Sequence, residues 1–434
     1  MINPREIASS LLFNVYKGKK LDWALGSNKN HIKLDARDRS FVNLLVLTAL
    51  RRNGQINQVI MDFIEKPLKK NSQVIFILRI AIAQLLFMKI PNYPVVDNAV
   101  EISKKYGLEK LVNGVLRNII RNKEDILLKT STEKNIPNWL KKDIVDYLGN
   151  DALTSISQQI VKEPFLDIKI KKSFFNKFNW EELLNGNKVF DEIIRINNPS
   201  EVSNLPYFKE GYWWVQGLAA TLPVIVINEI YKNSEKKKIN VLDVGASPGG
   251  KSFQLLDLGF SVQSIEISNI RIRKFIKNSN RLRYKNEIIK KDFLDFKSDK
   301  KFDCILIDAP CSASGLIQKK PEMLVVTKDI KNLLIKQEEM LINATKILKT
   351  GGYIIYCVCS IISAEGEKQI KKFLNEFKNF IPIDKFDSIK QFGKIIKDFP
   401  ALLITQQFFQ EKGGVDGFFI ACLKKKDEKY NKKN

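Results

Sequence analysis

Apolar residues recur at helical spacing along the first part of the chain, from residue 4 to about residue 120. Val96 and Ala99 illustrate this period, which continues until Gly107 interrupts it. Apolar positions three and four residues apart form one face of an α-helix, and glycine commonly follows a helix end. The pattern therefore predicts an all-α domain, to which we assign residues 1–128.

A polar stretch follows this domain, and Pro137 marks the start of a mixed segment. A helical pattern at 138–148 is followed by alternating apolar and polar residues at 166–171 and by a second helical pattern near 179–185. Alternation with a period of two is typical of a strand with one buried face. Residues 135–210 are therefore predicted to form a small α+β connecting domain.

Short apolar runs alternate with helical stretches in the rest of the chain. The runs cover residues 239–244, 262–267, 302–307 and 352–358. This alternation is the signature of βαβ units, whose parallel strands are buried on both faces. We expect residues 211–425 to form a doubly wound α/β domain of the Rossmann type, followed by a basic disordered tail at 426–434. The fold class is thus multidomain, with all-α, α+β and α/β parts.

The chain is strongly basic, with 72 Lys and Arg against 48 Asp and Glu and a net charge of +24. Such an excess favours a polyanion as partner, because neutralised phosphates release their counterions. RNA and DNA are the obvious candidates. A solvated lysine-rich surface is the alternative interpretation.

Histidine and cysteine usage excludes several classes of site. His31 is the single histidine, which argues against His-based zinc sites and Ser-His-Asp machinery in the C-terminal half. Five cysteines, all in that half, indicate reduced thiols in a cytoplasmic protein. The longest apolar stretch, 74–90, is interrupted by Arg79, Gln84 and Lys89, so we expect no membrane span.

A glycine-rich turn lies between a predicted strand and a predicted helix, in V-L-D-V-G-A-S-P-G-G-K-S at 241–252. Free backbone amides and a helix N-terminus suit an anionic or polar ligand there. The expected ligand-binding residues are Gly245, Ala246, Ser247, Pro248, Gly249, Gly250 and Lys251. The segment also fits the phosphate-binding loop of ATPases, which would make the chain an RNA-dependent ATPase.

Carboxylates at four successive strand ends favour S-adenosylmethionine over ATP. They are Asp243, Glu266, Asp292 and Asp308. Glu266 is placed to accept the ribose hydroxyls, Asp292 to accept from an adenine amino group, and Asp243 to orient the loop amides or the methionine amine. A phosphate-binding loop does not need this set. We therefore expect S-adenosylmethionine as methyl donor and no metal.

Two cysteines also follow apolar strands, Cys311 in D-A-P-C-S and Cys359 in Y-C-V-C-S. The carboxyl ends of parallel strands share one crevice, so both thiols are expected to face one ligand. A thiolate that adds to carbon 6 of cytosine makes carbon 5 nucleophilic enough to take a methyl group. Asp308 is placed to relay a proton at ring nitrogen 3, and the second thiol to support release. From these residues alone the two cysteines are exchangeable.

The remaining cysteines, Cys304, Cys357 and Cys422, lie inside or beside apolar strands and are expected to be buried hydrophobic residues.

These motifs resemble the Sun/Fmu family of rRNA (cytosine-5)-methyltransferases, the small-subunit rRNA methyltransferase B group, over nearly the whole chain. The similar segments are E-G-Y-W-W-V-Q at 210–216, G-A-S-P-G-G-K-S at 245–252, D-A-P-C-S-A-S-G at 308–315, K-T-G-G-Y-I-I-Y-C-V-C-S at 349–360, E-G-E at 365–367 and G-G-V-D-G-F-F at 413–419. The segments at 95–107 and 111–119 resemble the NusB-type helical RNA-binding fold.

The resemblance implies that Cys359 is the nucleophile and Cys311 the release cysteine. It also implies that Gly245 to Lys251, Glu266, Asp292 and Asp308 line the donor site. The first two domains would bind small-subunit rRNA, either free or in a pre-ribosomal particle, and the oligomeric state stays open.

The chain departs from the family pattern at Gly245, where the family commonly has cysteine, and at Gly217 and Val358. Donor binding should survive the first change, because glycine keeps the loop open. A non-catalytic RNA-binding or assembly factor is a further alternative. The intact Asp308, Cys311 and Cys359 argue against it.

Overall fold

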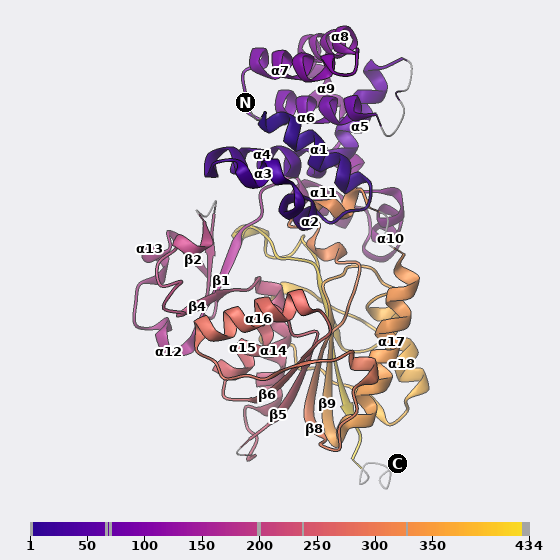
Figure 1. Ribbon diagram of the computed structural model, residues 1–434. Coiled ribbons are helices and arrows are strands. Elements are labelled where there is room, and N and C mark those ends of the chain that lie inside the picture. Colours follow the sequence, from indigo (N-terminus) through magenta and orange to yellow (C-terminus); the bar gives the residue numbers. More distant parts are fainter. Residues whose placement is uncertain are drawn as a thin grey trace. The chain divides into compact units, whose positions relative to one another are not determined.

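The computed structural model describes residues 3–65, 68, 72–197, 201–236, 238–326 and 329–427. Its contacts group the chain into two compact units, one of Met1–Lys162 with Ile317–Lys328 and one of Glu163–Leu316 with Asp329–Asn434 (Figure 1). The domain boundaries near residues 128 and 210 remain predictions. Residues 428–434 of the predicted tail lie outside the described part of the chain.

In its described residues the first unit contains helices and no strand, which confirms the predicted all-α character. Its helices are α1 (Pro4–Tyr16), α2 (Leu21–Ser27), α3 (Lys29–Lys33), α4 (Ala36–Arg51), α5 (Asn53–Phe63), α6 (Gln73–Phe87), α7 (Asn92–Lys104), α8 (Glu109–Arg121), α9 (Lys123–Lys129), α10 (Asn138–Leu148) and α11 (Asn150–Ile160), with 3-10 turns η1 (Thr132–Asn135) and η5 (Pro321–Leu324). None of the described helices is both long and apolar enough to cross a membrane.

Helix starts in this unit follow from local capping. The Asn3 side chain accepts a hydrogen bond from the Arg5 amide at 2.9 Å, and Pro4 opens α1. Gly107, with φ of +65°, follows α7, as the sequence predicted. Buried residues such as Leu11 and Leu116 then form one helical core.

A short segment from the C-terminal half of the sequence belongs to this helical unit. Val325 and Val326 pack against its core, and the Arg51 guanidinium donates to the Gln318 carbonyl at 3.3 Å. The helical unit is therefore built from two separate stretches of sequence, which the local patterns did not predict.

The second unit begins with an antiparallel sheet of four strands in the order β2-β3-β1-β4. Its elements are β1 (Leu166–Ile170), α12 (Lys172–Phe175), α13 (Trp180–Leu183), β2 (Gly186–Phe190), β3 (Ile193–Ile196), η2 (Val202–Asn204) and β4 (Trp213–Val215). The strand and helix predicted at 166–171 and 179–185 are confirmed as β1 and α13.

A buried ion pair fixes this small sheet to the rest of the unit. Asp167 on β1 takes two hydrogen bonds from Arg195 on β3, at 2.7 and 3.0 Å. The same carboxylate accepts from the Leu218 amide at 2.9 Å, at the start of α14 (Leu218–Tyr231). Because both groups are buried, removing either would leave an uncompensated charge.

A nine-stranded mixed sheet forms the core of the second unit, with order β11-β12-β13-β9-β8-β5-β6-β7 and β10 paired to β13. Its elements are β5 (Asn240–Val244), α15 (Gly250–Asp257), β6 (Ser261–Glu266), α16 (Asn269–Leu282), β7 (Ile288–Lys290), η3 (Phe293–Asp295), β8 (Phe302–Asp308), η4 (Ser314–Leu316), α17 (Ile330–Ile347), β9 (Leu348–Val358), α18 (Glu367–Glu376), β10 (Phe380–Pro382), η6 (Lys390–Phe392), β11 (Lys394–Ile395), β12 (Ala401–Ile404), η7 (Gln410–Lys412) and β13 (Phe418–Lys425).

The four predicted strands are present as β5, β6, β8 and β9, and they pair in parallel together with β7. β13 adds to β9 in the antiparallel sense and is followed by β12 and β11, so the sheet is mixed. The prediction of a parallel sheet holds only as far as β9, because the βαβ alternation ends there. Helices α14, α15 and α16 cover one face, and α17 and α18 the other (Figure 1).

The direction of winding reverses between β5 and β8, which are neighbours in the sheet. Asp243 of β5 lies opposite Leu306 of β8, and Val244 opposite Ile307. The two loops that follow these strands therefore leave the sheet side by side. Ligands of open α/β sheets bind at such a switch point.

Candidate active site

The turn after β5 requires glycine at two positions. Gly245 has φ of +78°, and a Cβ atom there would lie 2.6 Å from the Asp308 carbonyl oxygen. Gly249 has φ of +112°, and its Cβ would lie 2.2 Å from the Phe253 ring. The loops after β5 and β8 are thus in direct contact, and α15 begins immediately beyond Gly249.

Asp243 lies in the interior beside this turn and has no exposed surface. One carboxylate oxygen accepts from the Ser252 hydroxyl at 2.5 Å, while Oδ1 has no partner among the described residues. Burial raises the pKa of the Asp243 carboxyl to about 6. A buried acceptor without a donor fits a ligand that carries an ammonium group, such as the methionine end of S-adenosylmethionine.

Glu266 ends β6 and is 3% exposed. Its carboxylate accepts from the Ser268 amide at 3.0 Å and pairs with Arg271 at 3.2 Å. Arg271 also donates to the Ser247 carbonyl, so it connects the glycine-rich turn to Glu266. Glu266 is therefore held beside the turn, and its contact with the ribose remains a prediction.

Asp292 follows β7 and is half-buried. Its carboxylate accepts from the Leu294 amide at 3.0 Å and caps η3. This contact accounts for one oxygen, and the assignment of Asp292 to the adenine amino group remains a prediction.

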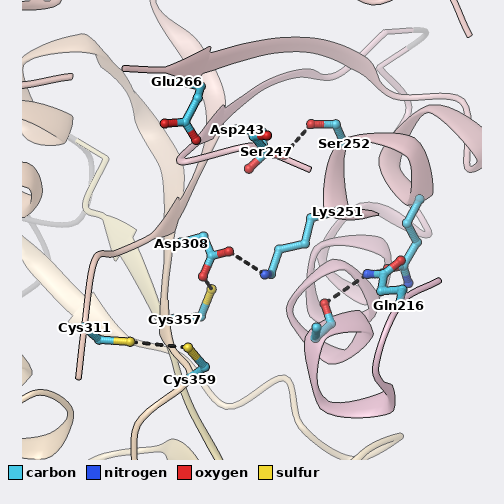
Figure 2. Close-up of polar contacts among 12 residues, drawn as sticks. Gln216, Asp243, Ser247, Lys251, Ser252, Glu266, Asp308, Cys311, Cys357 and Cys359 are labelled. Carbon is cyan, nitrogen blue, oxygen red and sulfur yellow. Dashed lines mark hydrogen bonds and ion pairs between the residues drawn. The ribbon is translucent and has the colours of Figure 1, made fainter. Parts of the chain in front are cut away.

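Asp308 ends β8 and pairs with Lys251, whose ammonium nitrogen lies 2.8 Å from Oδ2 (Figure 2). The side chains are 30% and 10% exposed, respectively, so water screens the pair only partly. Burial lowers the pKa of Lys251, but the attraction of Asp308 outweighs it and leaves that pKa above its usual value. Lys251 therefore stays charged and holds the Asp308 carboxylate in place.

Cys311 and Cys359 come together, with their sulfurs 3.4 Å apart (Figure 2). Cys311 follows β8 by three residues and Cys359 directly follows β9, and both are partly exposed. The hydrogen bond to Cys359, together with burial, raises the pKa of the Cys311 thiol well above its usual value. Cys311 is thus held as a thiol beside Cys359.

Cys304, Cys357 and Cys422 are fully buried in the core, as predicted. Burial raises the pKa of the Cys357 thiol, whose sulfur lies 3.9 Å from Oδ1 of Asp308. All five cysteines have free thiols.

Sequence reasoning gave no individual role to Ser252, Arg271 or Glu365. The first two contact predicted residues, as described above. Glu365 is completely buried and accepts hydrogen bonds from residues next to both Cys311 and Cys359. Its sequence signal is its place in the E-G-E segment at 365–367, which resembles the family but does not predict hydrogen bonds between two distant loops.

Comparison with known proteins gives a consistent result for both parts of the chain. Residues 230–424 match the family described as 16S rRNA methyltransferase RsmB/F, and residues 2–121 match the NusB family. A protein of Shewanella oneidensis named ribosomal RNA small subunit methyltransferase B is 31% identical, over 98% of this chain and 99% of its own length. A protein of the same name from Klebsiella pneumoniae is 29% identical, over 86% of this chain and 90% of its own length.

Solved structures share the fold. The protein PH0851 has a TM-score of 0.73 at 22% identity, covering 98% of this chain and 99% of its own. NSun6 from Pyrococcus horikoshii, solved with the ligand SFG, has a TM-score of 0.55 at 18% identity, covering 67% of this chain and 98% of its own.

Proposed function

The chain belongs to the ribosomal RNA small subunit methyltransferase B family, and we propose that it methylates carbon 5 of a cytosine in small-subunit rRNA through a covalent cysteine intermediate. One observation carries the cytosine-5 assignment. Two thiols, of Cys311 and Cys359, lie 3.4 Å apart beyond adjacent strands and close to a charged Asp308–Lys251 pair. Covalent activation of a pyrimidine requires a thiol nucleophile and a group that assists release.

S-adenosylmethionine, when bound, supplies an electrophilic methyl group on a sulfonium. Residues around the glycine-rich turn fit this donor: Oδ1 of Asp243, which has no partner in the described part of the chain, accepts from its ammonium group, and the Glu266 carboxylate accepts from its ribose hydroxyls. Asp292 accepts from the adenine amino group. That the reaction needs no metal is part of the same proposal.

Cys359 is the nucleophile in this proposal. A thiolate attacks carbon 6, whereas a thiol does not, and the raised pKa of Cys311 keeps that residue protonated in the free enzyme. We assign the nucleophile to Cys359 because the family resemblance implies this role for it and because it directly follows β9.

Cys311 assists release after methyl transfer. Before Cys359 has bonded to the base, the hydrogen bond between the two thiols and negative charge on Cys359 help to raise the pKa of Cys311. Once the Cys359 sulfur is bonded to carbon 6, both influences disappear and Cys311 ionises more readily. The resulting thiolate takes the proton from carbon 5, and the bond between Cys359 and carbon 6 then breaks to return the thiolate and the product.

Asp308 relays a proton at ring nitrogen 3, which becomes more basic when the thiolate adds to the ring. Lys251 holds Oδ2 of this carboxylate and the Cys357 thiol lies 3.9 Å from Oδ1, so the group is fixed in position for this relay. The target cytosine must leave its stack to reach these groups, as in other enzymes that act on bases.

The net charge of +24 and the NusB-family match of residues 2–121 support an rRNA substrate, free or within a pre-ribosomal particle. We place the reaction in the cytoplasm, because five free cysteines suit a reducing compartment. The phosphate-binding-loop ATPase is not retained, since the family accounts for the same glycine-rich turn and Lys251.

Transfer of labelled methyl groups from S-adenosylmethionine to unmodified small-subunit rRNA tests the proposal, with bisulfite sequencing to locate 5-methylcytosine. Cys359→Ala should abolish transfer but keep donor affinity. Cys311→Ala should accumulate a covalent protein–RNA adduct that resists denaturation. Cys422→Ala, a buried cysteine on β13, is the matched control and should retain transfer.

An active Cys359→Ala enzyme would refute the assignment of the nucleophile. Labelled product at an atom other than carbon 5 would refute the cytosine-5 reaction itself. Donor binding without transfer, on both free rRNA and small-subunit particles, would favour the non-catalytic RNA-binding alternative.

A further inference from the structure

Glu365 is a fully buried carboxylate in the turn between β9 and α18. It is not at a strand end, so its place is not explained by the switch-point rule that accounts for the other acidic residues. Its backbone is fixed by Tyr356 on β9, whose hydroxyl donates to the Glu365 carbonyl at 2.7 Å. Burying a carboxylate is unfavourable unless donors compensate it.

Two serines supply most of this compensation, and each directly follows one of the paired cysteines. Ser312, next to Cys311, donates from its amide to Oε1 at 2.8 Å and from its hydroxyl to Oε2 at 2.6 Å. Ser360, next to Cys359, donates its hydroxyl to Oε2 at 2.6 Å. One carboxylate therefore connects the loop after β8 to the loop after β9.

A helix on one face of the sheet completes the arrangement. Gln337 on α17 donates to Oε1 of Glu365 at 3.2 Å and to the Pro310 carbonyl at 2.9 Å. Pro310 directly precedes Cys311. The loop that carries Cys311 is thus held on both sides of the cysteine, by Ser312 and by Gln337.

These four hydrogen bonds use both oxygens of the carboxylate, and all four donors are neutral. Hydrogen bonds to an ionised acceptor are about twice as strong as neutral ones. Glutamine at this position would offer a single acceptor oxygen and would direct an amide N–H group towards donors. The arrangement therefore requires a carboxylate and not merely a side chain of the same shape.

We propose that Glu365 is a positioning residue that sets the separation of the Cys311 and Cys359 sulfurs and thereby allows attack and release to proceed in one site. This inference rests on the proposed function, in which the two thiols act in sequence. Catalytic groups must be held within a fraction of an ångström, and a displacement of about 1 Å can cost roughly a hundredfold in rate.

Glu365→Gln should lower kcat by about tenfold to a hundredfold, as expected when a hydrogen bond to a charged group is lost. The KM for rRNA and the affinity for the donor should stay within about twofold, because neither the glycine-rich turn nor the RNA surface is changed. Glu367→Gln is the matched control: Glu367 lies two residues further on and pairs with Lys371 at 2.6 Å. It should retain wild-type kinetics.

A chemical measurement reports the sulfur separation without RNA or methyl donor. Dibromobimane becomes strongly fluorescent only when both of its arms have reacted with thiols. The wild-type enzyme should cross-link quickly, Cys359→Ala should not, and Glu365→Gln should cross-link at least about tenfold more slowly. Equal cross-linking in Glu365→Gln and wild type would overturn the positioning role.

Ser360→Ala keeps the test decisive if Glu365→Gln does not fold. This change removes one bond between the carboxylate and the loop of Cys359 and leaves Ser312 in contact with Glu365. It should lower both kcat and the cross-linking rate, and unchanged values would overturn the inference. Where Glu365→Gln does fold, it should add little to Ser360→Ala in the double variant. Fully additive losses would show that the two residues act independently and would contradict the inference.

The two proposals fail in different ways. A wild-type enzyme that cross-links but does not methylate rRNA would refute the proposed function, while the cross-linking still tests Glu365. A wild-type enzyme that methylates rRNA, together with a Glu365→Gln variant of unchanged kcat and cross-linking rate, would refute the positioning role alone.

Discussion

Asp243→Asn should stabilise the second unit at neutral pH while it weakens donor binding. Asp243 has no exposed surface, and its Oδ1 has no partner among the described residues. Burial raises its pKa from 3.8 to about 6. At about 1.4 kcal/mol per pKa unit, an ionised Asp243 lowers the free energy of unfolding by roughly 3 kcal/mol relative to its protonated form. Asparagine is neutral at all these pH values and avoids this penalty.

The sign of the pH dependence follows from proton binding. Because the pKa of Asp243 is higher in the folded state, the folded state binds more protons between about pH 4 and pH 6. The free energy of unfolding must therefore fall as the pH rises through this window and level off above it. The difference between Asp243→Asn and wild type should grow by up to about 3 kcal/mol over the same window, less whatever the new amide group costs.

Native-state hydrogen exchange of the β5 amides, analysed by mass spectrometry between about pH 4 and pH 8, measures this difference within the second unit. Asp299→Asn is the control, because Asp299 is exposed and the same chemical change there should not alter the profile. Calorimetric titration with S-adenosylmethionine should show weaker binding by Asp243→Asn. A difference between variant and wild type that does not change with pH would refute the reasoning.

Two further predictions use matched pairs. Lys251→Met should destabilise the second unit by about 3 kcal/mol, because it leaves the carboxylate of Asp308 without its ammonium partner. Lys236→Met should cost under about 1 kcal/mol, because that lysine is 61% exposed. Urea unfolding of the two variants compares these losses, and equal losses would contradict the argument from burial. Gly245→Ala should weaken donor binding at least about tenfold, because the new Cβ would lie 2.6 Å from the Asp308 carbonyl oxygen. A Cβ added at Gly259 would meet no atom within 4 Å, so Gly259→Ala carries only the cost of the positive φ at that position. Donor titrations in which both alanine variants bind alike would contradict the second prediction.

Strand ends were the most predictable part of this molecule. Apolar runs gave β5, β6, β8 and β9, and the topology of an open sheet then required the residues after them to share one edge. On this basis Cys311 and Cys359 were expected to face one ligand, and their sulfurs lie 3.4 Å apart, whereas the ion pair of Asp308 with Lys251 was not predicted. These predictions succeeded because each depends on a local pattern and one general rule about parallel strands.

Contacts between distant segments were not predictable in this way. The antiparallel strands β12 and β13 follow no βαβ unit, so the pairing of β13 with β9 and of β12 with β13 had no local signal. The segment Ile317–Lys328 lies between β8 and α17 in sequence but groups with the helical unit. Its Val325 and Val326 are ordinary apolar residues whose partners are set by tertiary packing alone.

The two cysteines differ in how firmly the fold holds them, and this difference bears on their roles. Cys359 directly follows β9, which is hydrogen-bonded to β8 on one side and to β13 on the other. Cys311 lies in a loop in which Ala313 has φ of +60°, and this loop is held by side chains, Glu365 among them. A nucleophile must attack one atom in one direction, so it benefits from the more rigid position. The sheet therefore favours Cys359 as the nucleophile independently of any argument from thiol ionisation.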